Sequence, residues 1–136
     1  MINSSESDDP LSFHPTKLKG HKSSVSTLMT GFHHDILFSG GEDNTVRLWD
    51  CRTNRSNKCI LNCIQKPVSK ISVFPDDLNH ILVASGPSLL MFDMRKYEKS
   101  ILIREEDTSI TACSEEINDV DIQNISKHLI AAADDC

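Results

Sequence analysis

Short runs of β-branched and apolar residues recur along the chain from Lys17 onward. Each run is bounded by Gly, Pro, Asn, Asp or Ser, which is the pattern of strands separated by turns. No stretch keeps a 3.6-residue apolar period between two helix caps. The pattern therefore predicts an all-β fold, with strands near residues 25–29, 36–38, 46–49, 59–64, 68–74, 81–83, 89–92, 101–103, 117–122 and 129–132.

These expected strands form a repeat. The pair Val25 and Leu28 recurs as Val68 and Ile71 after 43 residues, and as Ile117 and Val120 after a further 49 residues. Each pair is followed by similar second and third strands, although the third copy stops after its second strand. The spacing fits a unit of four short strands, since a propeller blade takes ~40–45 residues. The extra residues of the second spacing lie in the acidic stretch 104–116.

The first copy of the repeat carries a specific set of residues. Gly20-His21 is followed by Ser39, Asp43 and then Trp49-Asp50, and this arrangement resembles a WD repeat of a β-propeller. The second and third copies are degenerate but in register. The resemblance implies an all-β WD-repeat β-propeller fragment of about two and a half four-stranded blades that is not closed. We expect a flexible acidic, Ser-rich tail at 1–16, blade 1 at 17–60, a degenerate blade 2 at 61–104, and the start of blade 3 at 105–136.

In the WD-repeat family a His, a Ser, an Asp and a Trp form a buried hydrogen-bond network, and the matching residues here are His21, Ser39, Asp43 and Trp49. The residue types suit a chain in which Trp donates, Ser and His relay, and Asp accepts. In the second repeat the apolar residues Ile64, Ala84 and Phe92 take the positions of His21, Ser39 and Trp49. In the third repeat Cys113 and Ala131 replace His21 and Ser39.

The segment Trp49-Asp50-Cys51-Arg52 suggests a partner. It is similar to the W-D-x-R signature of WD-repeat proteins that dock onto the damaged-DNA-binding adaptor of cullin-four ubiquitin ligases. Phe92-Asp93-Met94-Arg95 is a near-copy. An Arg just beyond a strand can make a bidentate contact with a carboxylate of the partner. The resemblance thus implies a substrate receptor whose partner-binding residues are Asp50, Arg52, Asp93 and Arg95. Alternatively, each aspartate only stabilises the turn that follows its strand.

The sequence supports an enzyme less well than an interaction scaffold. His21, Asp43 and Ser39 could form a catalytic triad, but the chain has no Gly-x-Ser-x-Gly elbow, and the spacing of Ser39 and Trp49 already has a structural explanation. The adjacent His33 and His34 would point to opposite faces of a strand, so we expect a turn there rather than metal ligands. We expect a non-enzymatic interaction scaffold without a cofactor or a metal. The alternatives are a scaffold for another complex and, less favoured, a propeller enzyme.

The net charge of −6 argues against a nucleic-acid-binding domain, which would concentrate positive charge. No apolar run approaches the ~18–20 residues of a membrane-spanning helix. The first residues lack the basic flank and apolar core of a secretory signal. Five cysteines without such a signal indicate free thiols in a reducing compartment. We therefore expect a protein of the cytoplasm or nucleus that binds other proteins, with no small-molecule substrate.

The length of 136 residues changes the picture once the repeat is recognised. A closed propeller has at least four blades, which takes ~160 residues even with short blades. The chain ends inside the third repeat, at Asp134-Asp135-Cys136. We therefore expect that further blades, or an oligomer that replaces them, complete the functional protein.

Overall fold

The computed structural model describes residues 15–31, 35–52, 56–61, 64–95, 109–111, 114–123 and 129–133. These residues form ten β-strands and no α-helix, which confirms the all-β prediction. Most of the expected tail at 1–16, the His33-His34 pair and the Asp134-Asp135 end lie outside the described residues. No helix among the described residues is long and apolar enough to cross a membrane.

The strands form three antiparallel sheets in chain order. The first sheet contains β1 (Val25–Thr30), β2 (Ile36–Gly41), β3 (Val46–Asp50) and β4 (Ser56–Leu61). The second contains β5 (Val68–Phe74), β6 (Asp77–Ser85), β7 (Ser88–Asp93) and β8 (Ser109–Thr111). The third contains β9 (Ile117–Ile122) and β10 (Leu129–Ala133). Four, four and two strands match the predicted two and a half blades.

The limit expected for the second blade differs from the observed sheet. Strand β8 lies beyond residue 104, and it pairs with β7 through Leu89 and Ile110. The strand expected at 101–103 lies outside the described residues. An edge strand makes hydrogen bonds on one side only, so an apolar run is a poor guide to which extended segment takes that position.

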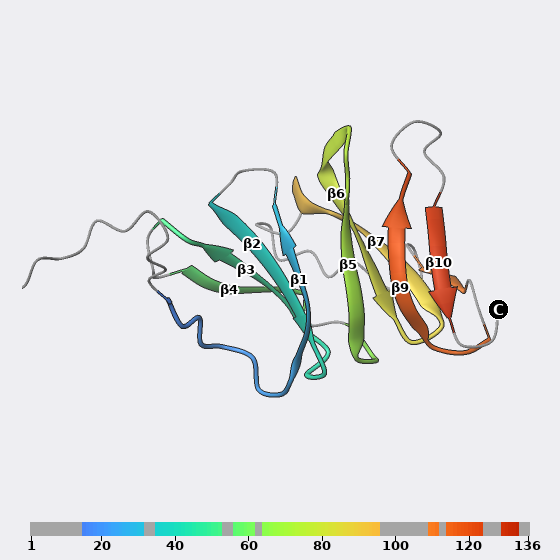
Figure 1. Cartoon of the computed structure of the whole chain (residues 1–136), viewed down its shortest axis with the longest axis horizontal. Helices are drawn as coiled ribbons and strands as arrows, with labels where there is room; N and C mark the ends of the chain where they lie inside the picture. Colours follow the sequence, from blue (N-terminus) through green and yellow to red (C-terminus); the bar gives the residue numbers. More distant parts are fainter. Residues whose placement is uncertain are drawn as a thin grey trace, which may run out of the picture.

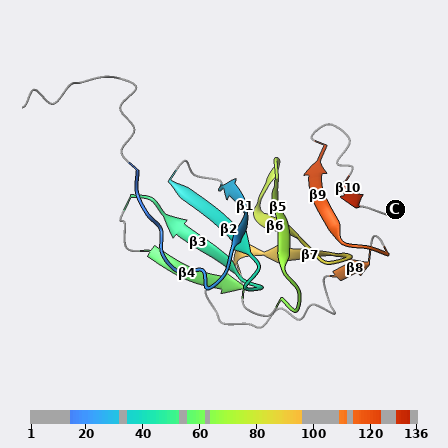
Figure 2. The same cartoon turned by 60° about the horizontal axis from the view of Figure 1, so that its bottom comes forward.

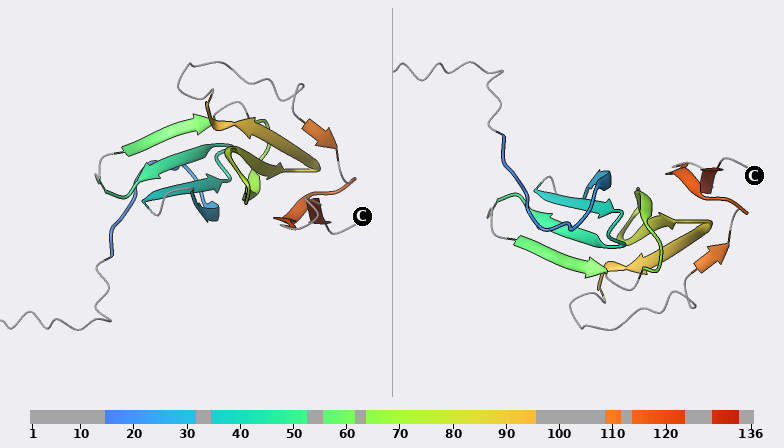
Figure 3. Two further views of the ribbon diagram at one scale, coloured as in Figure 1. Left: turned by 90° about the horizontal axis from the view of Figure 1, so that it is seen from above. Right: turned by 90° about the horizontal axis from the view of Figure 1, so that it is seen from below.

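The three sheets stack face to face (Figure 1), with the first and third sheets at opposite ends. The turned view shows β8 beside β7 at the outer edge of the second sheet (Figure 2). Seen from above and below, the stack is an open row of sheets rather than a ring (Figure 3). The described sheets therefore form the open stack that the repeat predicts.

Two hydrophobic cores hold the stack together. The first core joins the first two sheets around Phe38, Val46, Ile71 and Phe92. The second joins the second and third sheets around Leu82, Leu89 and Ile117. Successive residues of β6 enter different cores, because side chains of a strand alternate between its two faces. This explains why β6 is apolar along most of its length.

The close packing of the first two sheets depends on a glycine. A Cβ atom added to Gly40 would lie 2.4 Å from Cγ1 of Val68, so only glycine lets β2 approach β5 this closely. Polar contacts also cross the sheets. The Ile71 N–H donates to the Thr27 hydroxyl at 3.3 Å, and the Ser72 hydroxyl donates to the Val120 carbonyl at 2.9 Å.

Candidate functional site

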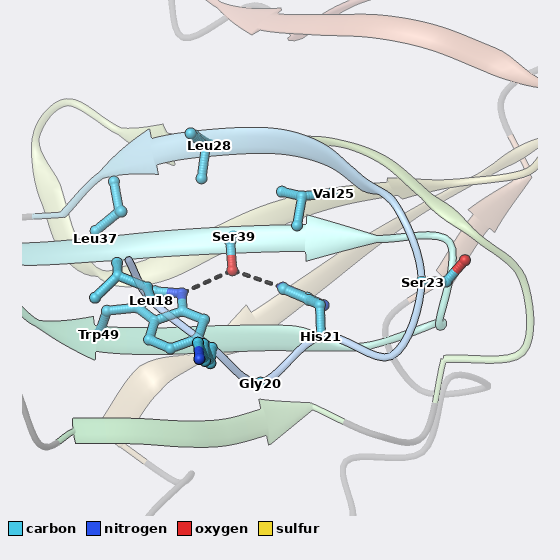
Figure 4. A pocket seen from close by; sticks show the side chains of 10 residues that line it. Leu18, Gly20, His21, Ser23, Val25, Leu28, Leu37, Ser39 and Trp49 are labelled. Carbon is cyan, nitrogen blue, oxygen red and sulfur yellow. Dashed lines mark hydrogen bonds between the residues drawn. The ribbon is translucent and has the colours of Figure 1, made fainter. Parts of the chain in front are cut away.

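A chain of hydrogen bonds lies on the face of the first sheet that is turned away from the second sheet. The indole Nε1 of Trp49 donates to Oγ of Ser39 at 2.7 Å, and Ser39 donates onward to Nε2 of His21 at 2.7 Å. Figure 4 shows Ser39 between the two rings. His21 Nδ1 lies 3.0 Å from both carboxylate oxygens of Asp43. Since Trp can only donate, this order makes Nε2 of His21 the acceptor and Nδ1 the donor.

Asp43 is the anionic end of this chain. It also accepts hydrogen bonds from the Lys22 N–H at 2.9 Å and from the Thr45 hydroxyl at 2.8 Å. Burial, the largest single influence, raises the pKa of Asp43. The hydrogen bonds from Lys22, Thr45 and His21 together outweigh it and lower the pKa to about 2. The carboxylate thereby ties the segment before β1 to the turn between β2 and β3.

Asp43, His21 and Ser39 thus stand in the order of a catalytic triad, but Ser39 is not presented as a nucleophile. It is only 2% exposed, and its oxygen already accepts the indole hydrogen bond. A hollow of about 350 Å³ borders the network, lined mainly by apolar side chains such as Leu18, Leu28 and Leu37. This geometry suits a structural network better than acyl transfer, which needs an accessible hydroxyl and an oxyanion site.

The strand pairing in the second sheet corrects one predicted equivalence, that of Ala84 with Ser39. In the first sheet Leu28 pairs with Ser39 and Leu37 with Trp49. In the second sheet Ile71 pairs with Val83, and Ile81 with Phe92. Val83, rather than Ala84, therefore occupies the position of Ser39.

Ala84 is one residue further along β6, so its side chain enters the core with the third sheet. Ile64, Val83 and Phe92 share the core between the first two sheets. The second sheet thus has apolar contacts where the first has the polar network. In the third sheet Ala131 pairs with Val120, which places it at the position of Ser39. Cys113 and Asp135 lie outside the described residues.

Two Asp–Arg clamps lie just beyond the third strands of the first two sheets. Asp50, the last residue of β3, accepts from Arg52 Nε and Nη2, both at 3.1 Å, and from the Arg52 backbone N–H at 3.0 Å. Asp93, the last residue of β7, accepts from Arg95 Nε at 2.9 Å, from Nη2 at 2.6 Å and from the backbone N–H at 3.0 Å. The same short turn is therefore built twice, one repeat apart.

Each clamp lowers the pKa of its aspartate and raises the pKa of its arginine, chiefly through the hydrogen bonds between the two side chains. Both guanidinium groups nevertheless remain open to a partner, since the side chain of Arg52 is 65% exposed and that of Arg95 is 64% exposed. Met94, between Asp93 and Arg95, is buried in the core of the first two sheets, whereas Cys51 is an exposed free thiol.

The sequence reasoning missed several neighbours of these sites. Thr45 supports Asp43, and its position two residues after an Asp is a usable signal for such a contact. Asp35 lies 3.9 Å from Arg52 Nε. His80 lies between two carboxylates: its Nδ1 is 2.6 Å from Asp77 Oδ2, and its Nε2 is 3.8 Å from Asp93 Oδ2. Asp35 lies directly before β2, and His80 is the residue of β6 that pairs with Asp93 of β7. Only the pairing of the strands brings these two residues to the clamps.

Among the residues that the structure describes, no three His, Cys, Asp or Glu side chains are grouped so that they could hold a metal ion. The side chains of Cys59, Cys63, Cys113 and Cys136 are not among those described. The expectation of free thiols can therefore be examined only at Cys51.

Comparisons with known proteins agree with the pattern of the first repeat. Residues 13–50 match the family model "WD domain, G-beta repeat". The chain is 33% identical, over 88% of its length, to the WD repeat-containing protein 53 homolog of Dictyostelium discoideum. It is 37% identical over 57% of its length to the THO complex subunit 6 homolog of Danio rerio, and 27% identical over 60% to the target of rapamycin complex subunit LST8 of Mus musculus.

The chain spans 32%, 26% and 26% of the lengths of these three relatives, so it corresponds to about a third of them at most. The family match covers the first repeat, which holds the hydrogen-bond network and the first aspartate of the clamps. The family match confirms that the first repeat resembles a WD repeat.

Proposed function

Because this chain carries a WD repeat at residues 13–50 on a stack of antiparallel sheets, we propose that it is a non-enzymatic scaffold for protein–protein interaction. Two of its relatives are named as subunits of complexes, the THO complex and the target of rapamycin complex. These names support a role as one part of a larger assembly. The cytoplasm or the nucleus is the place where we expect this role.

We further propose that the scaffold is a substrate receptor that docks onto the adaptor of a cullin-four ubiquitin ligase. The observation that carries this proposal is the duplicated clamp: Asp50 with Arg52 and Asp93 with Arg95 repeat one geometry at equivalent strand ends. A structural turn needs only its aspartate, which caps the following N–H. The exposed arginine in both copies favours a contact with a partner, since Arg is enriched where interfaces are strongest.

The hydrogen-bond network has a supporting part in this proposal. His21, Ser39, Asp43 and Trp49 join β2, β3 and the segment before β1, so they hold the strand whose end carries Asp50. We therefore assign these four residues a structural role, and we assign the contact with the adaptor to the clamp residues.

The test compares binding of the purified adaptor to the wild-type chain and to the double variant Arg52→Ala/Arg95→Ala. We expect the double variant to bind at least about tenfold more weakly, because truncation of interface arginines commonly has effects of this size. The double variant Lys22→Ala/Lys66→Ala is the matched control. It removes two exposed positive charges beside Asp43 and Gly86, at the ends of β3 and β7 opposite the clamps. Circular dichroism checks that each variant keeps its β-structure.

Equal binding of the wild type and the double variant would contradict the docking proposal. If the adaptor binds neither protein, while another assembly is recovered by the wild type and lost with the double variant, the chain is a scaffold for that other complex. That outcome would support the alternative of a general propeller scaffold over the ligase receptor.

A further inference from the structure

The clamps determine which chemistry a partner can offer them, and this inference rests on the proposed docking role. A guanidinium group has five N–H donors. In both clamps the aspartate accepts from Nε and Nη2 of the arginine. This leaves the two hydrogens of Nη1 and the second hydrogen of Nη2, for which the described part of the chain offers no hydrogen-bond partner. Each clamp therefore presents donors to a partner, at a side chain that is well exposed.

Among the residues that the structure describes, carboxylates outnumber guanidinium groups at each clamp. In the first clamp Arg52 is accompanied by two carboxylates, those of Asp50 at 3.1 Å and Asp35 at 3.9 Å. In the second clamp Arg95 is paired with Asp93, and His80 links Asp93 to Asp77. Counting only the described carboxylates and guanidinium groups, each clamp holds two negative charges and one positive charge.

This balance disfavours the bidentate contact with a partner carboxylate that the sequence suggested. A third carboxylate at either clamp would meet two carboxylates and one guanidinium group, and it would lose its own hydration. A carbonyl oxygen accepts the remaining N–H groups without adding charge. A lysine or arginine of the partner, placed beside the carbonyl, would balance the second carboxylate.

We propose that the two clamps, Asp50–Arg52 with Asp35 and Asp93–Arg95 with Asp77, form a docking surface for a protein segment that presents main-chain carbonyl oxygens between basic side chains. The remaining arginine donors bind the carbonyl oxygens, and Asp35 and Asp77 attract the basic side chains. The surface selects against acidic segments, which the negative charge of the clamps repels.

The test uses two peptides with the same backbone, Ac-Gly-Lys-Gly-Lys-Gly-NH2 and Ac-Gly-Glu-Gly-Glu-Gly-NH2. Each is added to the ¹⁵N-labelled chain at pH 7, and the side-chain Nε–H signals of Arg52 and Arg95 are followed by NMR. Substitution of each arginine by lysine assigns its signal. We expect the lysine peptide to shift both signals at concentrations at which the glutamate peptide does not. Larger shifts with the glutamate peptide, equal shifts with both, or no shift with either would overturn the proposal.

A double variant tests the part played by the second carboxylates. Asp35→Asn/Asp77→Asn removes the second carboxylate of each clamp and keeps both Asp–Arg pairs. We expect it to weaken binding of the lysine peptide by up to about fivefold, as for exposed ion pairs. Asp119→Asn/Asp121→Asn, with the same change of charge on the third sheet, is the control and should bind as the wild type does. Equal weakening in both double variants would overturn the assignment of Asp35 and Asp77.

The peptide measurements do not involve the ligase adaptor. If the adaptor fails to bind while the lysine peptide shifts the arginine signals, the docking surface stands and the ligase role falls. If the adaptor binds through Arg52 and Arg95 but the glutamate peptide is the one that shifts their signals, the ligase role stands and the proposed partner chemistry falls.

Discussion

Ser39 is the residue on which the hydrogen-bond network depends, since its single hydroxyl serves two neighbours. It accepts from Trp49 and donates to His21, and it is 2% exposed. In the second sheet Val83 occupies this position inside an apolar core, so the position is stable without polar contacts there. A network that is partly removed is worse than either, because buried polar atoms lose their partners.

We therefore expect Ser39→Ala to lower the free energy of unfolding by about 1–3 kcal/mol, since it leaves both the indole N–H and His21 Nε2 without a partner. Ser85→Ala is the matched control. Ser85 is equally buried, but within the described residues its hydroxyl makes one hydrogen bond, to the Lys66 carbonyl at 2.9 Å, so we expect a smaller loss. Chemical denaturation measures both. A loss with Ser39→Ala no larger than with Ser85→Ala would contradict the role assigned to the network.

Asp43 makes the stability of the first sheet depend on pH. Its pKa is lowered from 3.8 to about 2 in the folded chain, so the folded state favours the ionised carboxylate. The resulting stabilisation is complete above the unfolded value near 4 and is lost as the pH falls toward 2.

The measurement compares the free energy of unfolding of the wild type and of Asp43→Asn between pH 5 and pH 2. We expect the advantage of the wild type over the variant to shrink across this range, because protonation removes in the wild type the same charge that the variant lacks. A difference that stays constant with pH would show that ionisation of Asp43 does not stabilise the fold.

At the scale of elements, equivalent strands have different surroundings. Leu28 of β1, Ile71 of β5 and Val120 of β9 occupy the same position in successive sheets. Leu28 is 62% exposed, whereas Ile71 is 0% and Val120 is 3% exposed. β5 and β9 each pack against the preceding sheet, while no sheet of the described chain precedes β1. Sequence equivalence therefore does not imply equal contribution to stability.

We expect Ile71→Ala to lower the free energy of unfolding by about 2–5 kcal/mol, because it leaves a cavity in the first core. The equivalent Leu28→Ala should change it by no more than about 0.5 kcal/mol, as for an exposed position. Urea denaturation of both variants, at a protein concentration at which the chain is monomeric, tests this difference. Similar losses in the two variants would mean that the face of β1 is covered in solution.

At the scale of the whole molecule, the described side chains differ between the two ends of the stack. The open face of the first sheet exposes Val25, Leu28 and the neighbouring Leu18 beside the hollow. The third sheet exposes Asp119 and Asp121 of β9. Contiguous apolar surface of this kind favours association with other chains.

We expect the 136-residue chain to self-associate as its concentration rises, and Leu28→Asp to reduce this association. Met91→Asp is the control, because Met91 is a similarly large exposed side chain, 45% exposed, on the second sheet. Light scattering after size-exclusion chromatography measures the mass of each. Association of Leu28→Asp equal to that of the wild type would show that this face is not responsible.

The sequence by itself determined the repeat, the grouping of His21, Ser39, Asp43 and Trp49, and most of the strands, although it did not predict β8. Strand propensity and turn residues are local properties, and the donor and acceptor types of these four side chains permit one consistent order. The Asp–Arg spacing of the clamps was also readable, since both residues lie within three positions of one turn.

Only the tertiary structure decided which residue of β6 stands opposite Ile71, because a shift of one residue in register exchanges the two faces of a strand. It also brought Asp35, Asp77 and His80 to the clamps, so that each Asp–Arg pair has a second carboxylate in its surroundings. Register and stacking depend on contacts between residues far apart in the chain, and local sequence patterns do not specify those contacts.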